Sequence, residues 1–62
     1  MNTANIIAGL TILSRNCPDG YGATAWHDGI SHCAVRLSEA EVTELLALGW
    51  FRDGDEGWVA YV

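Results

Sequence analysis

The first apolar residues of the chain recur every three or four positions, which is the spacing of one helix face. They predict a helix over residues 3–14, and the positions on this face are Ile6, Ile7, Leu10 and Leu13. Asn2 or Thr3 is suited to cap the start of this helix. Gly9 lowers helix stability by about 1 kcal/mol relative to alanine, so we expect it to allow a close approach between the helix and a sheet.

A second helix is predicted over residues 37–49, with signals at both ends. Ser38 and Glu41 have the spacing of a capping box, in which each side chain bonds the backbone of the other. Gly49 suits the left-handed conformation that ends many helices. The predicted buried positions are Val42, Leu45 and Leu46.

Between the helices, the segments 23–27 and 30–35 predict two strands, and Asp28-Gly29 between them is a type I′ turn signal. Because strand side chains alternate, one face of this hairpin carries Ala23, Ala25, His27, Ile30, His32 and Ala34. The other face carries Thr24, Trp26, Ser31, Cys33 and Val35. Neither face is purely apolar, so the pattern leaves open which one is buried, although the alanine and isoleucine face suits a closely packed helix.

A second hairpin is predicted from segments 50–52 and 58–62 with a turn at 53–57, and Trp50 and Trp58 are expected in the core. The order of elements predicts a single α+β domain over residues 1–62 with the arrangement αββαββ. Its simplest closed form is a four-stranded antiparallel sheet with both helices on one face.

The charge of the chain lies at one end. The 62 residues carry a formal net charge of −5 and no lysine, and all of the net charge falls in residues 38–62. Such a surface repels nucleic acid and attracts basic protein surfaces. No apolar run approaches the roughly 20 residues that span a bilayer, and the start lacks the pattern of a signal peptide. We therefore expect a cytoplasmic protein, either a monomer or a homodimer.

The acidic side chains of the second half are the main candidate partner-binding residues: Glu39, Glu41, Glu44, Asp53, Asp55 and Glu56. We expect the turn at 53–57 to return alongside the second helix, which would join these carboxylates into one surface that docks onto a basic protein. The alternative is that they are only solubilising charges and turn formers. Duplex DNA carries one charge per about 1.7 Å, so a close DNA mimic would need a denser array.

Trp26 is a further candidate for partner binding, because it lies beside the first turn on the mixed face of the hairpin. If the alanine face is buried, Trp26 is exposed, and an exposed tryptophan is a common interface anchor. The alternative is that Trp26 belongs to the core or covers a sheet edge.

Metal binding and catalysis are less favoured. Cys17, His27, His32 and Cys33 are separated by nine, four and zero residues, whereas structural zinc sites use two closely spaced pairs. A zinc-stabilised module is therefore a weaker alternative. A cysteine nucleophile with either histidine and Asp28 needs a positioned base and a pocket, which the pattern does not indicate. We predict no catalytic residue, no metal or other cofactor, and no enzyme activity.

The segment LSEAEVTELLALGW at 37–50, followed by an acidic turn, Trp58 and the pair at 61–62, resembles a pattern in very small acidic proteins of phages and bacterial mobile elements. The hairpin residues 25–28 extend it. Such proteins include anti-CRISPR proteins. The resemblance implies a non-enzymatic inhibitor in the bacterial cytoplasm that occupies a basic, nucleic-acid-binding surface of a CRISPR surveillance complex. The alternative is a small phage accessory domain that docks a partner through Trp26 and apolar surface.

Overall fold

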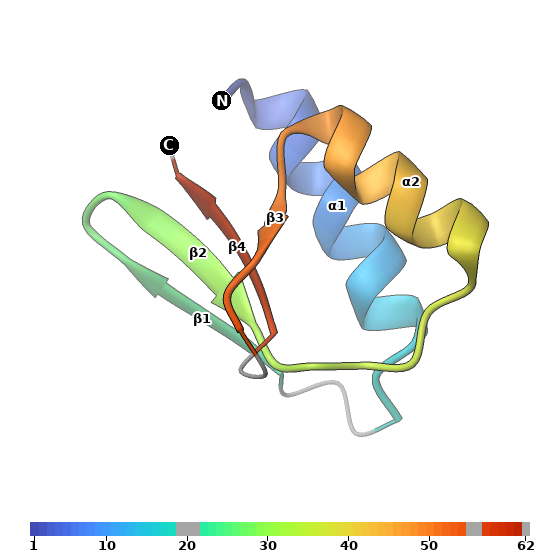
Figure 1. The fold of residues 1–62 in the computed structure, drawn as a ribbon. Coiled ribbons are helices and arrows are strands. Elements are labelled where there is room, and N and C mark those ends of the chain that lie inside the picture. Colours follow the sequence, from blue (N-terminus) through green and yellow to red (C-terminus); the bar gives the residue numbers. More distant parts are fainter. Residues whose placement is uncertain (19–21, 55–56, 62) are drawn as a thin grey trace.

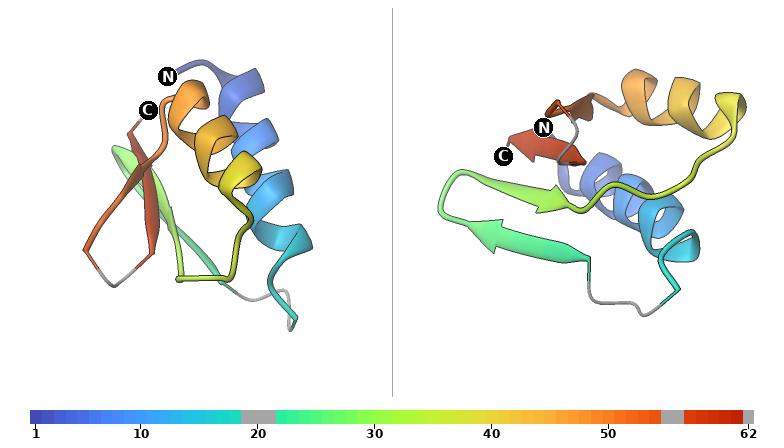
Figure 2. Two further views of the ribbon diagram at one scale, coloured as in Figure 1. Left: turned by 45° about the vertical axis from the view of Figure 1, so that its right-hand side comes forward. Right: turned by 60° about the horizontal axis from the view of Figure 1, so that its bottom comes forward.

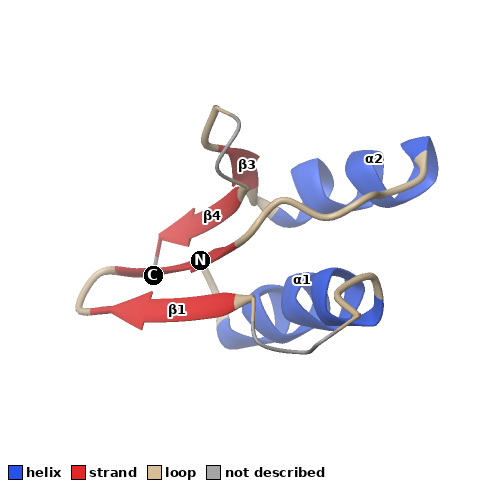
Figure 3. Cartoon of the chain, turned by 90° about the horizontal axis from the view of Figure 1, so that it is seen from below, coloured by secondary structure: helices blue, strands red, loops and turns tan. Residues whose placement is uncertain are grey.

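Two helices lie beside a four-stranded antiparallel sheet in the computed structural model, which describes residues 1–18, 22–54 and 57–61 (Figure 1). The elements in chain order are α1 (Thr3–Arg15), β1 (Ala23–Trp26), β2 (Gly29–His32), α2 (Glu39–Leu48), β3 (Phe51–Arg52) and β4 (Trp58–Tyr61). The strands are arranged in the order β1-β2-β4-β3. The α+β class and the predicted αββαββ order are therefore confirmed. Both helices lie to the same side of the sheet in the ribbon views (Figures 2 and 3).

Helix α1 begins at Asn2, whose side chain accepts a hydrogen bond from the backbone N–H of Asn5 at 2.8 Å. Ile12 and Leu13 are buried at its other end. The prediction that Ile6 and Ile7 share the buried face is wrong for Ile7, which is exposed. Adjacent helix residues point about 100° apart because 3.6 residues complete a turn, and at this end of α1 Ile6 packs partly against the core while Ile7 faces solvent.

Helix α2 has the predicted ends. The capping box of Ser38 and Glu41 is present, and Gly49 has a left-handed φ of 100°. Leu45 is fully buried at 0% exposure, whereas Leu46 is 54% exposed. The prediction that Leu46 is buried is therefore wrong, since it lies one position around the helix from Leu45 and faces away from the sheet.

The first hairpin pairs Trp26 with Gly29 and Ala25 with Ile30. Its two-residue turn is therefore His27-Asp28, and the predicted Asp28-Gly29 type I′ turn is wrong: Gly29 is the first residue of β2, and no non-glycine described residue has a positive φ. The assignment to the two faces is confirmed for residues 23–26 and 30–32, because the register differs from the expected one by two residues and side chains alternate with a period of two. It does not extend to residues 33–35, which lie beyond β2, and Val35 packs against the core instead of sharing a face with Trp26.

The register of all four strands defines two faces of the sheet. The inner face carries Ala23, Ala25, Ile30, His32, Arg52, Trp58 and Ala60. Trp50, Trp58 and Ala60 are buried together with Ile12, Leu13 and Leu45 of the helices, as expected for both tryptophans. The outer face carries Thr24, Trp26, Gly29, Ser31, Phe51, Val59 and Tyr61.

Candidate binding surfaces

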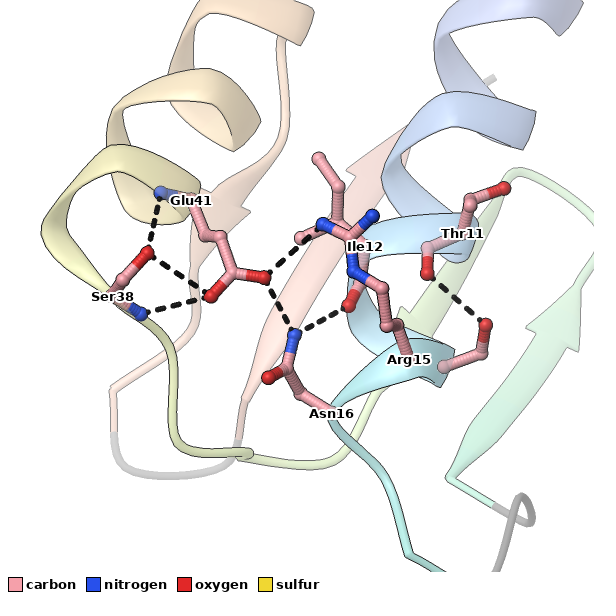
Figure 4. A network of polar contacts seen from close by, with 7 residues as sticks. Thr11, Ile12, Arg15, Asn16, Ser38 and Glu41 are labelled. Carbon is pink, nitrogen blue, oxygen red and sulfur yellow. Dashed lines mark hydrogen bonds and ion pairs between the residues drawn. The ribbon is translucent and has the colours of Figure 1, made fainter.

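Glu41 belongs to a polar network at the surface between α1 and α2 (Figure 4). Its Oε1 accepts hydrogen bonds from the Ser38 backbone N–H at 3.0 Å and from the Ser38 hydroxyl at 3.1 Å. Its Oε2 accepts from Asn16 Nδ2 at 2.8 Å and from the Arg15 guanidinium at 3.2 Å. These contacts join the end of α1 to the start of α2, two segments that are distant in the sequence.

The same contacts favour the ionised form of the Glu41 carboxylate. The backbone N–H of Ser38, then Asn16 and Arg15, lower its pKa from 4.5 to about 2. The Glu41 side chain is only 20% exposed and already holds one of the three arginines of the chain. We therefore leave Glu41 out of the surface that meets a partner, although the sequence predicted it there.

The other predicted acidic residues lie in separate places. Glu39 and Glu44 are exposed on α2, and Asp53 is exposed directly after β3. Asp55 and Glu56 lie outside the described residues. Figure 1 places the start of α2 and the chain that follows β3 on different sides of the lower half of the molecule.

Two arginines line a groove beside α2. A groove of about 260 Å³ is lined by Val35, Arg36, Leu37, Val42, Arg52 and Trp58. The Arg52 guanidinium carbon lies 5.7 Å from the centre of the Trp58 ring, a cation–π geometry. The groove thus places two positive charges beside Val42 of α2, and the exposed Asp53 directly follows Arg52 in the chain. That the six carboxylates form one surface stays a prediction, since Asp55 and Glu56 lie outside the described residues.

The outer face of the sheet instead presents an aromatic row, which we define as Trp26, Tyr61 and Phe51. The Trp26 and Tyr61 rings meet edge to face, with centroids 6.2 Å apart and planes at 86°. Tyr61 and Phe51 are 5.4 Å apart at 34°. The three side chains come from β1, β4 and β3. They are 44%, 55% and 38% exposed, in the order Trp26, Tyr61 and Phe51. Trp26 is exposed, but Ala23 and Ala25 of the opposite face are exposed as well, so the expectation of a buried alanine face under a closely packed helix is wrong for β1.

Gly29 makes this row possible. It pairs with Trp26 on one side and with Tyr61 on the other, so it lies between the two rings in the sheet. A Cβ added at Gly29 would lie 2.7 Å from Cζ2 of Trp26, too close for any real side chain. The missing side chain lets the indole lean across β2 toward Tyr61. Val59, on the same face and opposite Phe51, is buried.

Sequence reasoning did not identify Phe51 and Tyr61 as site residues. The available signal was the alternation along 58–61, which places Tyr61 on the face opposite the buried Trp58. Using it required the pairing of β2 with β4, two strands far apart in the chain, and the sequence does not specify that register.

Of the residues considered for zinc or nucleophilic chemistry, His32 and Cys33 both place their side chains beside Gly22, whereas His27 lies away from them at the hairpin turn. His32 is buried on the inner face, with Nδ1 3.0 Å from the Cys33 carbonyl oxygen. His27 is exposed at the hairpin turn, with Nε2 3.7 Å from Oδ1 of Asp28. Within residues 1–18, 22–54 and 57–61, no three or more histidine, cysteine or acidic side chains gather in a way that could hold a metal ion.

Comparisons of the chain with protein-family models, curated proteins and solved structures found no match. Among the described residues, no helix has the length and apolar character needed to cross a membrane.

Proposed function

We propose that this chain is a non-enzymatic protein-binding module whose docking surface is the aromatic row of Trp26, Tyr61 and Phe51. The observation that carries the proposal is that three large aromatic side chains meet on a sheet face that no described element covers. Single exposed apolar side chains are ordinary on protein surfaces, but a contiguous group indicates an interaction site. Tryptophan and tyrosine are also the residue types that most often dominate binding energy at interfaces.

The charge of the chain favours a protein partner over a nucleic acid. Exposed aromatic rings on a sheet also suit base stacking, but single-stranded nucleic acid binding requires a positively charged groove along the backbone. Here the net charge is −5, and the exposed Asp28 lies in the turn beside Trp26. The partner surface that fits is an apolar pocket for the indole bordered by basic side chains.

In this proposal the exposed acidic residues Glu39, Glu44 and Asp53 act before contact. Charges outside the buried centre of an interface mainly raise the association rate and make it salt-dependent. This role needs only an overall negative field and does not require the carboxylates to converge.

The sequence resemblance suggests the particular form of this function. In that form the protein is an inhibitor in the bacterial cytoplasm, and it acts by occupying a basic, nucleic-acid-binding surface of a CRISPR surveillance complex. Occupancy alone would inhibit such a complex, so the mechanism needs no catalytic residue and no cofactor.

The test is capture of the partner from a bacterial host lysate, identification by mass spectrometry, and measurement of affinity with purified components. Trp26→Ala and Tyr61→Ala should each weaken binding about 30-fold or more, which corresponds to the 2 kcal/mol or more of a hot-spot residue. Leu46→Ala is the matched control, because Leu46 is equally exposed but lies on α2.

A second pair of variants separates the two modes of docking. Glu39→Lys and Glu44→Lys should slow association and change its salt dependence, with little change in the dissociation rate. If these charge reversals abolish binding while Trp26→Ala leaves it intact, docking occurs through the acidic residues and the proposal is wrong.

A further inference from the structure

Strand β1 is exposed along its whole length. All four residues, Ala23–Trp26, are exposed, and β1 forms one edge of the sheet. Ala23 and Ala25 belong to the inner face by register, yet the helices do not cover them. The sheet therefore extends one strand beyond its core.

The free backbone groups of this edge follow from the register. Around a two-residue turn, the flanking residues Trp26 and Gly29 form a hydrogen-bonded pair, and such pairs recur at every second position. The Cys33 N–H donates to the Gly22 carbonyl at 3.0 Å, which agrees with this phase. The backbone groups of Ala23 and Ala25 therefore point away from β2. Within residues 1–18, 22–54 and 57–61, no turn or loop segment forms a backbone hydrogen bond to either of them.

The edge also lacks the features that usually prevent strand pairing. Natural edge strands are protected by lysine, proline, bulges or very short length. Residues 22–26 contain no charge and no proline. At the opposite edge, β3 has only two residues, one of which is Arg52, and Asp53 follows it. Of the two edges, β1 alone is open to another strand.

We propose that β1 pairs antiparallel with β1 of a second copy of this chain. In this register Ala25 of each copy lies opposite Ala23 of the other, and Thr24 lies opposite Thr24 on the twofold axis. The two outward-facing alanines of each copy exchange N–H and C=O groups with the other copy, which gives four hydrogen bonds across the axis. The contact is self-complementary, as a twofold interface requires.

The absence of charge makes this edge the place where two copies meet with the least repulsion. Two chains that each carry −5 repel one another over most of their surfaces, so they associate most easily where neither is charged. Residues 22–26 are such a place. Four-residue pairing buries much less than the roughly 1,200–2,000 Å² of a stable interface, so the dimer forms only at high protein concentration. This inference does not depend on the proposed function, although pairing at β1 would bring two aromatic rows onto one continuous sheet.

The test is sedimentation equilibrium of the full chain across a wide range of protein concentration. The weight-average mass should rise from 6.7 kDa toward twice that value, and amide exchange at Ala23 and Ala25 should slow as concentration rises. Ala25→Pro removes an N–H that bonds nothing within β1 and β2, and proline is tolerated at such edge positions. This variant should stay monomeric at every concentration, with its fold checked by circular dichroism.

A charge substitution gives a second, independent variant. Ala25→Lys should abolish the rise in mass, whereas Ala47→Lys, which makes the same change on the exposed surface of α2, should leave it in place. A monomeric wild-type protein at all concentrations overturns the proposal. So does a dimer that persists in both Ala25 variants, because the copies then meet at another surface. If the wild type is monomeric and captures a protein partner, and Ala25→Pro no longer captures it, the strand that pairs with β1 belongs to that partner and the proposal is also overturned.

Discussion

The indole of Trp50 lies directly against the backbone of Gly9. A Cβ added at Gly9 would overlap Nε1 and Cε2 of the Trp50 ring, and Nε1 donates a hydrogen bond to the carbonyl of Asn5 at 3.1 Å. The glycine thus fits the close approach expected from the sequence, but it meets a tryptophan rather than the sheet. This contact attaches α1 to the segment that follows α2.

Gly9→Ala is expected to destabilise the protein despite its favourable effect on the helix. Alanine gains about 1 kcal/mol in helix propensity, whereas overpacking against a buried ring costs about 1–3 kcal/mol, and displacing Trp50 also strains its hydrogen bond. Urea unfolding followed by tryptophan fluorescence measures the difference. Thr11→Ala is the control, since it improves helix propensity at an exposed site of α1. A Gly9→Ala variant as stable as the wild type would contradict the contact.

The stability of the protein should fall in acid because of Glu41. Its pKa in the folded protein is about 2, below the ordinary value of 4.5. A carboxylate with a lowered pKa contributes fully above its ordinary value and loses this contribution as pH falls toward its folded value. Melting temperatures measured between pH 4.5 and about 2 should decrease more steeply for the wild type than for Glu41→Gln. Glu44→Gln, at an exposed position of the same helix, should keep the wild-type slope.

Leu45 and Leu46 should respond very differently to the same truncation. Leu→Ala in a core costs about 2–5 kcal/mol, and a domain of this size has on the order of 3–5 kcal/mol to lose. Leu45→Ala should therefore lose half or more of the unfolding free energy of the wild type, measured by urea denaturation followed by circular dichroism. Leu46→Ala should change the unfolding free energy by less than about 0.5 kcal/mol. Equal effects of the two variants would mean that α2 is rotated relative to the sheet.

Gly49 should tolerate asparagine better than alanine. Its φ of 100° places a side chain in the left-handed region, which costs an ordinary residue about 1–2 kcal/mol. Asparagine visits this region more readily. Chemical denaturation should rank the wild type first, Gly49→Asn second and Gly49→Ala last. A reversed order of the two variants would contradict the left-handed cap.

The sequence predictions were right where the interacting residues are close together in the chain and wrong where they are far apart. Both ends of α2 were predictable because Ser38 and Glu41 are three residues apart and act on the backbone between them. The first turn was not predictable, because Asp28-Gly29 is a local turn signal while Gly29 is required in β2 beneath Trp26. That requirement comes from the ring and from β4, not from neighbouring residues.

The charged contacts of the surface also depend on residues that are far apart in the chain. Composition gives the net charge, but it does not show that Arg15, 26 residues before Glu41 in the chain, holds that carboxylate. Nor does it show that Arg36 and Arg52, which are distant in the chain, line one groove beside α2. Such pairings depend on how α1, α2 and β3 are placed around the core.

The sequence by itself determined the order of the elements, the two ends of α2, the alternation of the strands and the burial of Trp50 and Trp58, since each depends on spacing over a few residues or on a large apolar side chain. Only the tertiary structure decided that β1 meets solvent on both faces while β2 is largely covered, and only the pairing of β2 with β4 and of β4 with β3 gathered the aromatic row. The physical reason is that strand register and helix placement are fixed by packing across the whole core, where residues distant in the chain compete for the same space.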